Sequence, residues 1–287
     1  MNFWKRIFPV IIFTAKVGIV SSSVFTKTLY INRGSFVTVA STSFPALAFN
    51  ETAAFNALNA VIDLTTNDTL QITISNNDSI PHGFEVKNFL VPGDTISSGN
   101  SKSYSIHSNN EGVFLFYDPL NYPANRYMGL GGMICVSNSS GKKYYWNIKE
   151  HEMLFNNSIG AGASVSFNSY NPDYFTINGK SFPDLQNDST AVPDNSIGDT
   201  IIIFMVNTGQ SKHAIHFHGF HPKAVYSTIP QQNNRIKDTW PLESMEGYVL
   251  QLVADKQGQY SVHDHNLVAV SGGGIHPNGM FLIMKFQ

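Results

Sequence analysis

The sequence repeats itself once, and this repeat constrains the fold more than any other feature. The tripeptide SFP at 43–45 recurs at 181–183, and the dipeptide GM at 132–133 recurs at 279–280. The repeat unit is therefore roughly 140 residues long, well above the periods of about 20 to 50 residues that solenoids use. A chain of 287 residues is expected to hold two copies of one domain.

The strongest segments are short and rich in β-branched or aromatic residues, as strands are. They include TLQITIS, VFLFY, TIIIFMV, YVLQLV and MFLIMKF, which are bounded by turn formers such as NND, NTG and PNG. No stretch keeps a helical period over three turns. We therefore predict an all-β protein with two tandem Greek-key β-sandwich domains, at 23–150 and 173–287, joined by a linker at 151–172.

The N-terminus has the pattern of a secretory signal. Lys5 and Arg6 precede an apolar run from Ile7 to Ala15, which is shorter than the roughly 20 residues that span a bilayer as a helix. We expect residues 1–22 to be a signal peptide of an exported protein, periplasmic or secreted, that is cleaved or retained as an anchor. A buried first strand or helix is the alternative, since no A-x-A cleavage site is present.

Composition excludes several classes of function. The 18 basic and 20 acidic residues nearly balance, so no global field favours nucleic acid as a partner. No P-loop or dinucleotide fingerprint is present, which argues against nucleotide chemistry. A single cysteine, Cys135, excludes an intramolecular disulfide and any cysteine-rich zinc site.

Histidines carry the chemistry of the second half. His216 and His218 form one H-x-H pair, and His263 and His265 form another. Side chains at i and i+2 of a strand share a face, so four imidazoles converge if the two strands meet. Imidazole suits copper, zinc, iron or nickel, and copper is the strongest divalent competitor. We expect a copper site here, with zinc or iron as alternatives.

The second half resembles the multicopper oxidases, in particular two-domain laccase-like proteins and copper nitrite reductases. The resemblance lies in PDYFTINGKSFPD at 172–184, GDTIIIFMVNTGQSKHAIHFHG at 198–219 and GQYSVHDHN at 258–266. It implies tandem cupredoxin-like domains, an oxidoreductase activity and a homo-oligomer, namely a trimer. In that family the residue at His213 would bind a type 1 copper, while the two H-x-H pairs would serve the type 2 and type 3 coppers.

The sequence also departs from the family pattern at the type 1 site. This site needs a thiolate with two histidines and a weak axial ligand, but Asp264 stands where the family has cysteine. In the first half, the positions opposite the four histidines are Glu85, Lys87, Tyr117 and Pro119. The family's trinuclear cluster takes eight histidines, so four-electron reduction of oxygen is not supported.

Two ligand sets therefore remain open. In the first, His216, His218, His263 and His265 hold one metal ion, with a water at the open position. In the second, a converted type 1 pocket binds the metal; its residues are His213, Asp264, His276 and Met280. Asp264 could also act as a proton relay beside the histidine cluster.

Two functions are consistent with these residues. One is an exported copper oxidoreductase that uses a small oxidant or a nitrogen oxide and an external electron donor. The other is a non-catalytic cupredoxin-like protein that binds or buffers copper, or uses the metal to stabilise an assembly.

Overall fold

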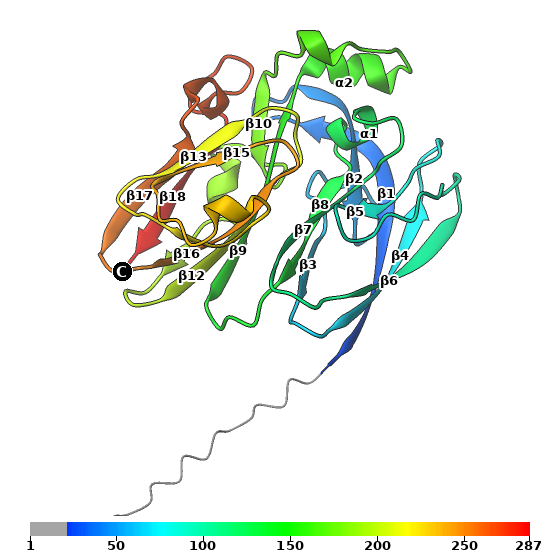
Figure 1. Cartoon of the computed structure of the whole chain (residues 1–287). Helices are drawn as coiled ribbons and strands as arrows, with labels where there is room; N and C mark the ends of the chain where they lie inside the picture. The colour runs from blue at the N-terminus through cyan, green and yellow to red at the C-terminus, as the bar shows by residue number, and fades with distance from the viewer. Residues whose placement is uncertain (1–21) are drawn as a thin grey trace, which may run out of the picture.

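The computed structural model describes residues 22–287. The expected signal peptide therefore lies outside the described residues, apart from its last position. The described part of the chain forms two β-sandwiches that follow each other in sequence (Figure 1). The predicted all-β fold with two tandem sandwiches is confirmed.

The first sandwich consists of two four-stranded sheets. In spatial order, one sheet contains β2 (Ser43–Asn50), β1 (Val24–Val37), β4 (Thr69–Asn76) and β6 (Ser101–His107). The other contains β3 (Val61–Leu64), β8 (Gly131–Val136), β7 (Gly112–Tyr117) and β5 (Glu85–Val86). A short helix, α1 (Ala124–Tyr127), lies in the connection between β7 and β8.

The second sandwich consists of two five-stranded sheets. One contains β10 (Tyr174–Ile177), β9 (Lys142–His151), β12 (Thr200–Asn207), β16 (Gly247–Val253) and β14 (Lys223–Ser227). The other, which carries the histidines, contains β11 (Asp194–Asn195), β18 (Phe281–Phe286), β17 (Gly258–Asp264), β13 (His213–Phe217) and β15 (Thr239–Leu242). The helices of this half are α2 (Met153–Gly160) and single 3₁₀ turns at Phe167–Ser169, Asp184–Asn187, Pro230–Gln232 and Leu267–Val270.

The strand pairings place the boundary between the two sandwiches before β9, and not at the predicted residue 150. Strand β9 pairs in parallel with β12 and antiparallel with β10, so residues 142–150 belong to the second sandwich and not to the first. The segment 151–172, expected as a linker, is instead an excursion between β9 and β10 of the second sandwich. Its helix α2 lies over β2 of the first sandwich (Figure 1). Asn156 of α2 donates to the carbonyl of Pro45 at 2.8 Å and accepts from Tyr127 Oη at 2.6 Å.

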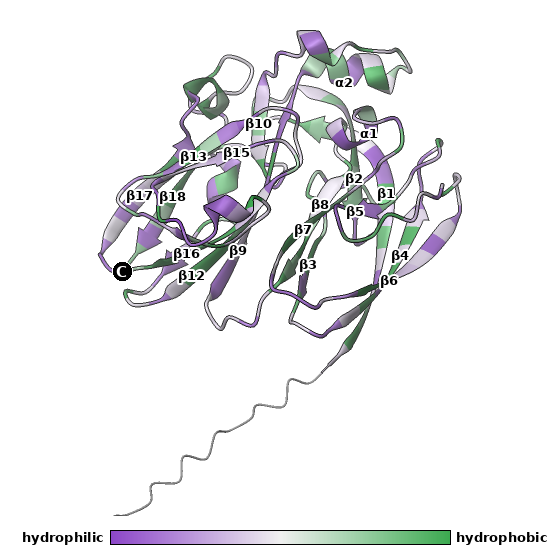
Figure 2. Ribbon diagram, in the orientation of Figure 1, coloured by the Kyte–Doolittle hydropathy of each residue, from purple (hydrophilic) through white to green (hydrophobic). Residues whose placement is uncertain are grey.

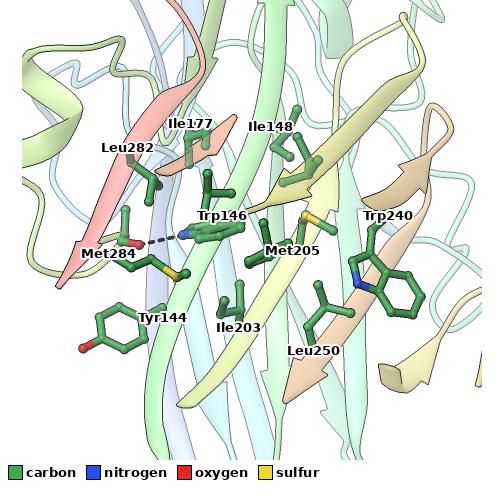
Figure 3. Close-up of a cluster of buried hydrophobic side chains, with 14 of the residues drawn as sticks. Tyr144, Trp146, Ile148, Ile177, Ile203, Met205, Trp240, Leu250, Leu282 and Met284 are labelled. Carbon is green, nitrogen blue, oxygen red and sulfur yellow. Dashed lines mark hydrogen bonds between the residues drawn. The ribbon is translucent and has the colours of Figure 1, made fainter. Parts of the chain in front are cut away.

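The core of the second sandwich supports the strand that carries the histidines. Trp146 on β9 is fully buried and stacks on Phe217 of β13, with ring centroids 5.5 Å apart. Its indole N–H donates to the carbonyl of Ala191 at 2.6 Å (Figure 3). Because an aromatic pair adds to the free energy of burial, this contact fixes β13 against the opposite sheet.

A separate apolar cluster joins the two sandwiches. It is formed by β7 and β8 from the first half and by β12 and β16 from the second, strands that Figure 2 colours mainly as hydrophobic. Its buried members are Val113, Leu115, Met133, Cys135, Ile202, Phe204, Val206, Met245 and Val249. The two halves are therefore packed on each other through side chains as apolar as a core.

Within residues 22–287, no helix combines the length and the apolar composition needed to cross a bilayer.

Candidate metal centre

Strands β13 and β17 are antiparallel neighbours, and their register brings the two H-x-H pairs together. His216 lies directly opposite His263. His218 follows the end of β13 and donates its backbone N–H to Ser261 on β17 at 2.9 Å. His265 follows the end of β17 and donates its backbone N–H to Ala214 at 2.8 Å.

The four histidines lie on the outer face of their sheet. His213, Ile215 and Phe217 of β13 are buried, whereas the intervening positions are more exposed. The ring centroid of His216 lies 4.7 Å from that of His218, 5.7 Å from that of His263 and 5.5 Å from that of His265. The Nε2 atoms of His218 and His263 are 3.0 Å apart. The period of two in a strand thus gathers the first ligand set on one surface.

Two of the rings are oriented by partners at Nδ1. His216 Nδ1 lies 2.8 Å from Thr239 Oγ1, and His263 Nδ1 lies 2.8 Å from the carbonyl of Asp264. A carbonyl can only accept, so His263 carries its proton on Nδ1 and presents a lone pair at Nε2. Partners of this kind fix the orientation of metal-ligating imidazoles in proteins.

The surroundings of His216 keep its imidazole neutral, which is the form that binds metal. Burial and the neighbouring imidazoles of His218, His263 and His265 lower the pKa of His216, against an opposing effect of Asp238. The ring is therefore neutral at pH 7 and its lone pair is available.

The fit to a metal ion is partial in the observed side-chain positions. Among residues 22–287, no three histidine, cysteine or carboxylate side chains converge on one point as ligands. The separation of 3.0 Å between the Nε2 atoms of His218 and His263 is close to the ~3.3 Å expected for two imidazoles on one tetrahedral ion at about 2.0 Å.

The second ligand set is not assembled in the same way, because His213 is already paired on both ring nitrogens. Its Nδ1 lies 2.6 Å from Asp264 Oδ2, and its Nε2 lies 3.1 Å from Glu150 Oε2 on β9. Both partners are acceptors only, so both nitrogens carry protons and the ring is an imidazolium. His276 is exposed on its loop, and Met280 is buried in the core.

The pKa values of His213 and Glu150 agree with this geometry. Burial favours the neutral imidazole, but the hydrogen bonds and charges of Asp264 and Glu150 outweigh it and raise the pKa of His213 to about 9. Burial likewise favours the neutral carboxyl of Glu150, yet His213 and the backbone N–H groups of Ser211 and Gln210 lower its pKa to about 2. A protonated His213 thus lies between Asp264 and Glu150.

Asp264 faces away from the four outer histidines. It is fully buried, and its Oδ1 accepts from the backbone N–H of Ala214 at 3.3 Å and of Asn266 at 2.9 Å. Its side chain therefore orders the ends of β13 and β17, and only its backbone carbonyl contacts the histidine cluster, through His263.

The first sandwich repeats the buried arrangement. His82 lies between Asp118 Oδ2, 2.6 Å from Nδ1, and Asp78 Oδ2, 2.8 Å from Nε2. His82 and Asp118 are the repeat counterparts of His213 and Asp264. Arg33 forms a bidentate ion pair with Asp78, at 2.7 Å for both bonds. Each sandwich therefore holds a buried imidazolium clamped between two carboxylates.

The first sandwich has no counterpart of the outer histidines. Tyr117 donates to Glu85 at 2.8 Å, and Lys87 donates to the backbone carbonyl of Met245 in the second half at 2.6 Å. Cys135 is buried in the cluster between the sandwiches, where burial raises its pKa well above the usual value. The lone thiol is therefore protonated and enclosed.

Two carboxylates of these pairs were missed in the sequence. Glu150 lies at the end of a strand assigned to the wrong half, and no pattern links it to His213. Asp78 stands four residues before His82, a spacing that indicates no contact outside a helix. The one signal in the sequence is the repeat, which relates His82 and Asp118 to His213 and Asp264.

A family model described as multicopper oxidase matches residues 161–277. Among curated proteins, no match was found.

Solved structures share the fold of nearly the whole chain. The blue copper oxidase from Nitrosomonas europaea superposes with a TM-score of 0.78 at 21% identity, over 92% of this chain and 86% of that chain. The multicopper oxidase mgLAC gives a TM-score of 0.77 at 20% identity, over 93% and 87%. The copper nitrite reductase from Nitrosomonas europaea gives 0.73 at 18% identity, over 92% and 94%. The resemblance to multicopper oxidases and the two cupredoxin-like domains are confirmed.

Proposed function

We propose that this protein is a copper-binding oxidoreductase that lacks a type 1 centre and holds its metal at His216, His218, His263 and His265. Copper bound there would supply a one-electron Cu(II)/Cu(I) couple. The co-substrate is a small oxidant or a nitrogen oxide, and the electrons come from a donor outside the chain.

The observation that carries the proposal is the outer face of β13 and β17. Four imidazoles lie within 4.7 to 5.7 Å of a neighbouring ring in the cluster, and His216 is held neutral by its surroundings. A surface of several imidazoles binds Cu(II) more strongly than the other common divalent ions. The multicopper oxidase match over residues 161–277 supports copper over zinc or iron.

Metal analysis with EPR tests the site. Protein from copper-supplemented cells is expected to contain about one copper per chain with a type 2 spectrum and no blue absorption band. The double variant His216→Ala/His265→Ala should lose this copper, because it removes two of the four imidazoles.

A matched control is His221→Ala, since His221 is exposed and lies close in sequence but is not part of the cluster. Copper that is lost equally in the control, or retained in the double variant, would overturn the ligand set. Zinc or iron found in place of copper would overturn the metal.

A non-catalytic copper-binding role is the second candidate, and the position of Cys135 favours it. The lone thiol is fully buried between the sandwiches, so within the described residues no thiolate offers electrons a route to the copper. Turnover of a phenol donor by copper-loaded protein separates the two functions. Copper binding without turnover beyond that of His216→Ala/His265→Ala supports the second.

Export and assembly belong to the same proposal. Export rests on the apolar run that follows Lys5 and Arg6, and cell fractionation with N-terminal sequencing tests it. A homotrimer rests on the family resemblance, and light scattering of the copper-loaded protein tests it.

A further inference from the structure

A cleft of about 420 Å³ opens on the first sandwich, remote in sequence from the histidine cluster. Its walls come from β1, from the connection that contains α1, and from the segment that follows α2. This volume lies within the range of about 300 to 1,000 Å³ that small-molecule sites occupy. The excursion at 151–172 therefore forms one side of an open cleft.

Arg33 is the charged side chain that lines this cleft. Its Nε and Nη2 are held by Asp78, which fixes the plane of the guanidinium. Within residues 22–287, Nη1 has no hydrogen-bond partner, and about a third of the side chain is exposed. A guanidinium oriented in this way presents a donor that matches a carboxylate oxygen.

The remaining wall is mixed, and its apolar part lies on both sides of the cleft. This apolar part is formed by aliphatic and aromatic side chains that are partly or fully buried: Leu47, Ile80, Met128, Ile159, Val165 and Phe167. Tyr122 stands at the rim with more than half of its surface exposed. An apolar body in this cleft would be shielded from water on the side that faces the wall, and a ring would find aromatic partners.

The charges behind the wall balance one another. Asp78 and Asp118 are buried and both pair with His82, and Asp78 also pairs with Arg33. Two cations thus face two carboxylates, and the guanidinium is the charged group of this network that lines the cleft. Asn125 connects this network to the cleft, which it lines, and donates its amide to Asp118 at 2.8 Å.

We infer that this cleft binds a small organic carboxylate with an aromatic or branched aliphatic body. The carboxylate pairs with Arg33, and the body lies against the apolar wall between α1 and the 159–167 segment. The site is independent of the copper proposal, because none of its lining residues belongs to the second sheet of the second sandwich.

Binding of 2-naphthoate tests the inference, with 2-naphthylmethanol as the neutral probe of equal shape. Calorimetry on the full protein should show one site per chain for 2-naphthoate and binding at least tenfold weaker for the alcohol. A hydrogen bond to a charged group is worth about 1.5 to 3 kcal/mol, so Arg33→Gln should weaken 2-naphthoate about tenfold or more and leave the alcohol unchanged.

Arg33→Gln also breaks the ion pair with Asp78, so a second variant keeps the test decisive. Ala163 is exposed at the cleft wall, and Ala163→Trp should fill the space and abolish binding while the Arg33–Asp78 pair remains. Ala163→Ser is the matched control, and Lys27→Gln controls for loss of a positive charge elsewhere on β1. The inference is wrong if the alcohol binds as tightly as the acid, or if Ala163→Trp binds 2-naphthoate normally.

Discussion

The two buried histidines share one arrangement of partners. In each sandwich, both ring nitrogens meet carboxylates at 2.6 to 3.1 Å, so the histidine is held as an imidazolium. A carboxylate at Asp264, where the multicopper oxidase pattern has cysteine, is the change that makes this possible. The substitution is visible in the sequence, but the partner that closes the pocket, Glu150, is not.

The contacts of His82 with Asp78 and Asp118 predict that the protein is less stable at high pH. Burial opposes its charge, but Asp118 and Asp78 outweigh burial and raise the pKa of His82. A raised folded-state pKa gives stabilisation that is complete below the unfolded value of about 6.5 and is lost as pH rises through the folded value. Urea unfolding of the apo protein should therefore give a smaller free energy of unfolding at pH 10 than at pH 6.

The variant His82→Gln isolates this effect. It leaves the buried Asp118 without its cation, while Asp78 keeps Arg33, and this should cost about 3 to 5 kcal/mol at pH 6. The difference in stability between wild type and variant should shrink as pH rises. His107→Gln, at an exposed histidine, is the control, and an unchanged difference from pH 6 to pH 10 would contradict a protonated His82.

At the scale of strands, alternation explains which parts of the site the sequence could predict. Each H-x-H pair lies at neighbouring same-face positions, so the gathering of the four imidazoles followed from the pairing of β13 with β17. Strand β9 was not recognised as part of the second half. Its residues are largely buried on both faces, so no alternation of polar and apolar residues indicates which sheet it belongs to. The contact of Glu150 with His213 could not be predicted for the same reason.

A hydrogen bond from β15 is predicted to orient the imidazole of His216 for metal binding. Thr239 lies opposite His216 in the antiparallel register and holds its Nδ1 at 2.8 Å. Thr239→Val keeps the shape of the side chain but removes the hydroxyl. Loss of such a partner typically weakens metal binding about 10- to 100-fold, so the copper dissociation constant should rise by at least about tenfold in a chelator competition.

Thr239→Ser retains the hydroxyl and should bind copper as the wild type does. Equal affinity of Thr239→Val and wild type would mean that this hydrogen bond does not position His216 for the metal.

At the scale of the whole molecule, the two sandwiches are joined by more than the apolar cluster. Arg126 of the first half is fully buried and donates to the backbone carbonyl of Thr208 in the second at 2.8 Å. Asn147 of β9 donates to the carbonyl of Gly131 at 2.7 Å. Separation of the halves would exchange these hydrogen bonds for bonds to water, and an intramolecular hydrogen bond contributes a net of about 0.5 to 1.5 kcal/mol.

The two halves are therefore expected to unfold together, and Cys135 reports this directly. Its thiol lies in the cluster between them, so a thiol reagent should label it only when the protein unfolds. Phe204→Ala in the cluster and Phe220→Ala in the core of the second sandwich should each cost about 3 kcal/mol. Both should then accelerate labelling about a hundredfold under native conditions. If only Phe204→Ala accelerates it, the sandwiches separate while each stays folded, and the interface is a hinge and not part of one cooperative core.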